Sequence, residues 1–156
     1  MKHARDITGS TTVGDTTGVM HVADMVITCL RQWNRNGAAA AFALLRDRMG
    51  AAQAGASVRA LQDLADILEA HMRRPLRCHA PHCSCVGTDE AAIARFVEEA
   101  AFGARDDALM LASLLVDCRG ILPLTDAAAR FGLCVHRAAL CAAVRTMPEP
   151  TSQTRH

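Results

Sequence analysis

Apolar side chains recur along most of this chain at steps of three and four residues, the spacing that places side chains on one face of an α-helix. Glycine or proline follows most of these apolar stripes, and both are typical of helix ends. The pattern predicts helices at residues 19–36, 38–49, 58–72, 88–102, 106–119, 125–132 and 133–145. Residues 50–55 are expected to form a connector, and the apolar run at 109–116 is expected at the centre of the core.

Composition agrees with a helical fold. The chain has 156 residues, of which 30 are alanine, and only 3% are aromatic, with no tyrosine. Sheet folds normally draw on β-branched and aromatic residues. We predict one all-α domain, a bundle of five to seven helices over residues 18–146, with a Cys/His-rich loop at 77–87 between two helical halves. A disordered N-terminal tail is expected at 1–17 and a C-terminal tail at 147–156.

The charge balance and the distribution of apolar residues limit the partners. A formal net charge of +1 predicts no strong attraction of the whole molecule to a phosphate backbone. The chain has no apolar run of the kind found in a secretory signal or a membrane span, so we expect a cytoplasmic protein without a membrane partner. In that reducing compartment the seven cysteines are expected to be free thiols or thiolates.

The most informative motif is the segment R-C-H-A-P-H-C-S-C-V-G. Its proline removes a backbone donor and restricts the residue before it, which predicts a loop and not a helix. Sulfur and imidazole donors on a short loop suit zinc, and they also suit Cu(I) or an iron–sulfur unit. The segment places five such donors within eight residues: Cys78, His79, His82, Cys83 and Cys85.

We take four of these five residues, all except His82, as the preferred ligands, and zinc is the expected ion. His82 is a substitute for His79, and His71 or His136 from other parts of the chain are further substitutes for one ligand. Two other interpretations stay open. The cysteines could be redox-active thiolates beside arginines, or the five residues could be ordinary polar loop residues. The preferred ligands are Cys78, His79, Cys83 and Cys85.

The spacing of small residues at 124–145 indicates a different function, DNA binding. Small residues and Gly132 are spaced there as in a helix-turn-helix motif, in which glycine supplies the turn between the two helices. The second helix would present His136 and Arg137 to the major groove of DNA. The competing interpretation is an ordinary helical hairpin in the core, because the segment carries few other polar groups.

Enzymatic motifs are sparse. The sequence has no Glu-x-x-His pair before His71 or His136, no phosphate-binding glycine loop, no serine elbow and no H-E-x-x-H pattern. A Cys83 nucleophile with a histidine base is the one enzymatic arrangement left. The hypothesis is therefore a small cytoplasmic regulatory or adaptor protein with a zinc-binding loop that senses metal or oxidant. Its partner would be another protein or a second copy, and the alternative is a DNA-binding transcriptional regulator.

Overall fold

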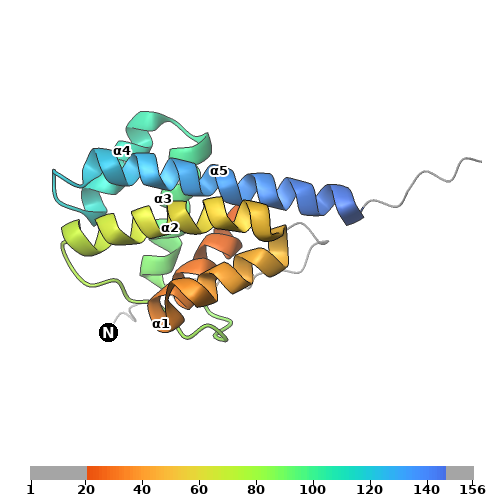
Figure 1. Ribbon diagram of the computed structural model, residues 1–156. Helices are drawn as coiled ribbons and strands as arrows, with labels where there is room; N and C mark the ends of the chain where they lie inside the picture. Colours follow the sequence, from red (N-terminus) through yellow and green to blue (C-terminus); the bar gives the residue numbers. More distant parts are fainter. Residues whose placement is uncertain (1–20, 147–156) are drawn as a thin grey trace, which may run out of the picture.

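The computed structural model describes residues 21–146, and the helix start expected at Val19 and both expected tails, 1–17 and 147–156, lie outside this range. The described residues form five helices packed as one all-α bundle, which confirms the predicted fold class (Figure 1). Within them, no helix has the length and apolar character needed to cross a bilayer. The helices are α1 (Val22–Met49), α2 (Ala51–His71), α3 (Thr88–Phe102), α4 (Arg105–Leu115) and α5 (Ile121–Thr146).

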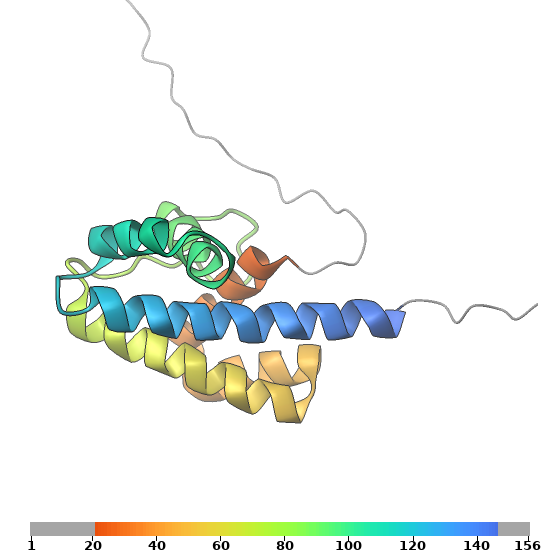
Figure 2. The same ribbon diagram turned by 90° about the horizontal axis from the view of Figure 1, so that it is seen from above.

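Helix α5 is the centre of the bundle, because it packs against each of the other four helices. Figure 2 shows α3 and α4 on one side of α5 and α2 on the other. The apolar stripes of α1, α2, α3 and α5 meet in one core. Phe96 of α3 and Phe131 of α5 are its largest fully buried side chains.

The sequence expectation of a break at Gly37 is confirmed inside α1. Gly37 has φ 78° and ψ −175°, which lie outside the helical region and bend the helix. Positive φ is readily adopted by glycine, which has no Cβ. The second such glycine, Gly50 at φ 87°, forms the sharp turn between α1 and α2.

The connector expected at residues 50–55 is wrong, because α2 already begins at Ala51. Alanine has the highest helix propensity, and this segment is rich in it. Ala54 and Ser57 are buried in the first two turns, and the Ser57 hydroxyl donates to the Gln53 carbonyl oxygen at 3.0 Å. Packing of the small residues therefore extends the helix through positions that resemble a loop in the sequence.

The central position expected for the apolar run at 109–116 is also wrong. Met110 is 65% exposed and Leu114 is 74% exposed, whereas the smaller Ala108 and Ala112 are buried. Among the helices, α4 packs mainly against α3 and α5, and the face that carries Met110 and Leu114 meets solvent. The apolar run does not show which face of the helix is covered.

Both interpretations of residues 124–145, the helix-turn-helix and the helical hairpin, are wrong, because α5 is continuous through Gly132. A Cβ at Gly132 would lie 2.7 Å from the Ala101 Cβ and 3.0 Å from the Val97 carbonyl oxygen. The glycine therefore allows α3 to approach α5 closely and does not form a turn. The His136 ring packs edge-on against Phe102, with centroids 4.8 Å apart. DNA binding by His136 and Arg137 thus loses the motif on which it depended.

Candidate metal centre

The segment between α2 and α3, residues 72–87, is anchored at its start to the link between α4 and α5. Met72 pairs with Val116 in an isolated antiparallel bridge, and the Asp117 amide donates to the His71 carbonyl oxygen at 3.0 Å. Further on, the Cys83 amide donates to the Ala80 carbonyl oxygen at 2.9 Å, which closes a tight turn. Pro81 occupies the second position of this turn, where its fixed φ is favourable. The turn brings Cys83 back toward His79.

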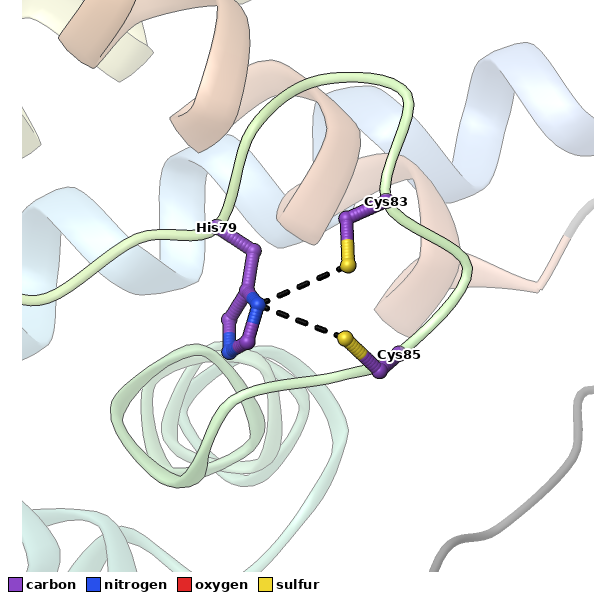
Figure 3. Close-up of side chains that lie close together, drawn as sticks. All are labelled: His79, Cys83 and Cys85. Carbon is purple, nitrogen blue, oxygen red and sulfur yellow. Dashed lines mark hydrogen bonds between the residues drawn. The ribbon is translucent and has the colours of Figure 1, made fainter.

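Three donor atoms of this loop converge on one point (Figure 3). The Nδ1 atom of His79 lies 3.5 Å from the Sγ atom of Cys83 and 3.3 Å from the Sγ atom of Cys85. All three donors lie within 4.8 Å of one another. A nitrogen at about 2.0 Å and a sulfur at about 2.3 Å from a tetrahedral zinc ion are about 3.5 Å apart. The two N–S distances are therefore those expected around a tetrahedral ion.

The other two loop candidates are not part of this group of three. Cys78 is half-buried, and burial raises the pKa of its thiol to about 11, with a further contribution from the Glu90 carboxylate. His82 is exposed in the turn. Among the substitutes considered, His71 Nδ1 lies 3.3 Å from Asp117 Oδ1, and His136 packs on Phe102.

A buried ion pair between α1 and α3 is hydrogen-bonded to the backbone of the donor group. Arg31 Nε donates to Glu90 Oε1 and Arg31 Nη2 donates to Glu90 Oε2, both at 2.7 Å. Arg31 is 6% exposed and Glu90 is fully buried. The same guanidinium donates to the carbonyl oxygens of Cys83 at 2.7 Å and Cys85 at 2.6 Å. Arg31 therefore holds the backbone of both cysteines of the donor group.

Glu90 holds His79, the third residue of the donor group, in the same way. Its carboxylate accepts from the His79 amide and from the Gly87 amide, each at 2.8 Å. Burial alone would raise the pKa of Glu90, but the hydrogen bonds from Arg31 and from these two amides lower it to about 2. One ion pair thus fixes the backbone of all three residues of the donor group.

The neighbouring carboxylate, Asp89, fastens the first part of the loop. It accepts from Arg74 Nη1 at 2.8 Å and Nη2 at 2.5 Å, and from the Arg77 amide at 3.0 Å. The hydrogen bonds from Arg74, followed by the one from Arg77, lower the pKa of Asp89 to about 2. Both carboxylates in the first turn of α3, those of Asp89 and Glu90, therefore accept hydrogen bonds from the loop.

The imidazole of His79 rests directly on Gly87. A Cβ at Gly87 would lie 2.8 Å from His79 Cδ2 and 3.0 Å from His79 Nε2. The φ of Gly87 is an ordinary −75°, so the glycine is needed for space and not for backbone conformation. This contact leaves Nδ1 as the nitrogen that faces the two sulfurs (Figure 3).

The two thiols of the group differ in acidity. The pKa of Cys83 is lowered, mainly because the Cys85 thiol donates a hydrogen bond to it, with His79 adding to the effect. The pKa of Cys85 is raised by the same contact. Cysteine binds metal as the thiolate, and Cys83 becomes a thiolate at a lower pH than Cys85 does.

Arg31 and Glu90 were not expected from the sequence as parts of the site. A signal for Arg31 does exist, because it lies four residues after Ile27 and beside Leu30, on the buried face of α1. Glu90 is the third residue of α3, where an acidic side chain is favourable in any helix. Its second role, as a partner of Arg31, depends on a contact between residues far apart in the sequence.

Comparisons with protein-family models, with curated proteins and with solved structures found no match to this chain.

Proposed function

We propose that this protein binds one zinc ion through His79, Cys83 and Cys85 and acts as a regulatory or adaptor protein whose loop conformation depends on that ion. The observation that carries this proposal is the convergence of three soft donor atoms within 4.8 Å. Their backbone is held by a buried ion pair, so the chain orders the site before any ion arrives. Such support behind metal ligands commonly affects affinity strongly.

The donor set and the charge balance favour zinc among the metals considered. Thiolate and imidazole ligands select Zn²⁺ or Cu⁺ over Mg²⁺ and Ca²⁺. Two thiolates and one neutral imidazole exactly balance a divalent ion but leave a negative charge around Cu⁺. Arg31, the nearest buried cation, is already paired with Glu90. An iron–sulfur cluster normally takes four protein ligands, one more than this group offers.

A regulatory role is supported by the position of the group between the surface and the core. His79 and Cys85 are exposed, so a bound ion would lie where a partner protein meets it. The same loop contacts α1 through Arg31 and α3 through Glu90. Gain or loss of the ion would therefore change the surface shape at the junction of two helices. We propose that the protein acts in the cytoplasm, where a reducing environment would keep free thiols such as these reduced.

The test is metal analysis of the full chain purified without added metal, followed by Co²⁺ titration with absorption spectroscopy. The wild-type chain should bind one ion and show thiolate-to-cobalt charge transfer. His79→Ala, Cys83→Ser and Cys85→Ser should each weaken binding by tenfold or more. Cys118→Ser is the matched control, because Cys118 is exposed and lies outside the group. Equal binding by Cys118→Ser and Cys83→Ser would contradict the proposal.

A thiol redox function is the second candidate, favoured by the proximity of the half-buried Cys83 and the exposed Cys85, two thiols of unequal acidity. Peroxide would oxidise the two thiols to one disulfide, with loss of two protons and two electrons and reduction of peroxide to water. Mass spectrometry of the metal-free protein would detect the loss of two hydrogens per chain. Zinc binding and this disulfide use the same two sulfurs, so saturation with zinc should slow the oxidation.

A further inference from the structure

The three converged donors fill three of the four positions around a tetrahedral ion. Structural zinc sites take four protein ligands, whereas sites with three protein ligands keep one position open for water or substrate. Within residues 21–146, the group that includes His79 has three members. A fourth donor is therefore needed to close the site, and the loop contains two further candidates, Cys78 and His82.

The backbone of Cys78 is held on both sides by the first turn of α3. The preceding amide, that of Arg77, donates to Asp89 Oδ2 at 3.0 Å. The following amide, that of His79, donates to Glu90 Oε1 at 2.8 Å. Hydrogen bonds to charged acceptors are among the strong ones, so the Cα atom of Cys78 is fixed next to His79. Rotation about the Cα–Cβ bond is then the main freedom left to its sulfur.

The thiol of Cys78 lies near the same buried ion pair that holds the donor group. Burial raises its pKa most, the Glu90 carboxylate adds to this effect, and the Arg31 guanidinium opposes it. The same guanidinium donates to the carbonyl oxygens of Cys83 and Cys85. The three cysteines of the loop therefore surround one ion pair, and the sulfur of Cys78 is on the loop side that faces α1 and α3.

His82 is the less suitable of the two candidates. It is the third residue of the turn closed by the Cys83 amide and the Ala80 carbonyl oxygen, and its side chain is exposed. Cys78 is half-buried beside the ion pair and needs no change of the turn that brings Cys83 toward His79. A thiolate from Cys78 also matches the soft donors already present. Burial, position and donor type thus all favour Cys78.

We propose that Cys78 is the fourth ligand and that its side chain rotates toward the three converged donors when the ion binds. This inference rests on the proposed zinc site and extends it to a closed site of three thiolates and one imidazole. The group of three is assembled without the ion, so Cys78 is the residue whose position changes with metal binding. A site closed by four protein ligands has no position for a substrate, which agrees with a regulatory or adaptor role.

X-ray absorption spectroscopy of the zinc-loaded full chain counts the ligands directly. We expect three sulfurs at about 2.3 Å and one nitrogen at about 2.0 Å from the ion. In Cys78→Ser the count should fall to two sulfurs. Zinc affinity should weaken by at least the effect of losing an outer-shell partner, about tenfold. Two sulfurs in the wild-type chain would overturn the inference.

The absorption of the Co²⁺-loaded chain compares the variants. The charge-transfer absorption per ion should fall by about one third in Cys78→Ser, because the number of thiolates on the ion falls from three to two. Cys78→Ala should show the same fall, and circular dichroism verifies that both variants keep the fold. Cys134→Ser is the matched control, because Cys134 is also partly buried and lies outside the donor group. A spectrum changed by His82→Ala and not by Cys78→Ser would assign the fourth position to His82 and overturn the inference.

Failure of the zinc site and failure of this inference give different results. A chain that binds neither zinc nor cobalt would contradict the proposed function itself. Metal binding with a spectrum that Cys78→Ser leaves unchanged would contradict the role of Cys78 alone. The mass measured by light scattering should not change when the ion is added, because all four ligands belong to one copy. A dimer that forms only with metal and is lost in Cys78→Ser would overturn closure within one chain.

Discussion

Arg31 and Glu90 are 59 positions apart in the sequence, yet they form a two-pronged buried ion pair beneath the three converged donors. The remaining hydrogen bonds of the pair end on the backbone of the loop, at Cys83, Cys85, His79 and Gly87. The order of the loop therefore depends on the packing of α1 against α3. Substitution of either residue of the pair should therefore affect both the proposed metal site and the stability of the bundle.

We expect Glu90→Gln to destabilise the fold by about 3–5 kcal/mol, because it leaves the buried Arg31 charge without its partner. Chemical denaturation of the metal-free protein measures this change. Asp63→Asn is the control, because it removes an exposed ion pair with Arg130 and should cost at most about 1 kcal/mol. Similar losses for the two variants would mean that the Arg31–Glu90 pair has no special role.

Gly87→Ala should lower zinc affinity without unfolding the bundle. Its Cβ would lie 2.8 Å from His79 Cδ2, so the imidazole must shift from the position in which Nδ1 faces the two sulfurs. Isothermal titration with zinc measures the effect, for which we expect a weakening of about tenfold or more. Gly55→Ala is the control, because its Cβ meets only Arg59 Nη1 at 3.8 Å and should leave affinity unchanged. Unchanged affinity in Gly87→Ala would show that the ring position is not critical.

Gly132→Ala should destabilise the fold by about 1–3 kcal/mol through overpacking of α3 against α5. Its Cβ would lie 2.7 Å from the Ala101 Cβ, a distance that requires the helices to separate. The same substitution at Gly55 should instead stabilise the protein by up to about 1 kcal/mol, because alanine has the higher helix propensity. Opposite shifts of the melting temperature would confirm this, and stabilisation by both would contradict the close helix contact.

The metal-free protein should lose stability as the pH falls through the range from about 4.5 to about 2. The pKa values of Asp89 and Glu90 are lowered to about 2 in the folded state, below their ordinary values of 3.8 and 4.5. Their contribution is therefore fully present above the unfolded-state pKa values and is lost as both carboxylates become protonated. Denaturation curves at several pH values measure the slope. Asp89→Asn should flatten it, whereas a slope unchanged by Asp89→Asn would contradict this origin.

Removal of zinc with a chelator should loosen the loop without loss of helix content. The core of α1, α2, α3 and α5 has no contribution from the ion, since its side chains are apolar. Hydrogen exchange should accelerate at the amides of residues 79–87 and stay slow in the centre of α5. Circular dichroism should remain unchanged. Collapse of helical circular dichroism on chelation would show that the ion supports the whole fold.

The all-α class and the bounds of α3 were predictable because they depend on local spacing. The stripe of α3 and its acidic first turn are readable within fifteen residues, and so is the bend at Gly37. The errors at 50–55, 109–116 and Gly132 share one cause. In each, a local signal of small or apolar residues was interpreted without knowledge of the surface that would face it.

The sequence alone determined that this chain forms helices and that soft metal donors gather on one proline-containing turn, because helix periodicity and turn chemistry act between close neighbours. Only the tertiary structure decided which donors converge, because Cys83 and Cys85 are held by Arg31 from a helix more than fifty residues earlier, and His79 is held by Glu90, the partner of Arg31. Contacts over such separations depend on how α1 and α3 pack, and no pattern within the loop itself encodes that geometry.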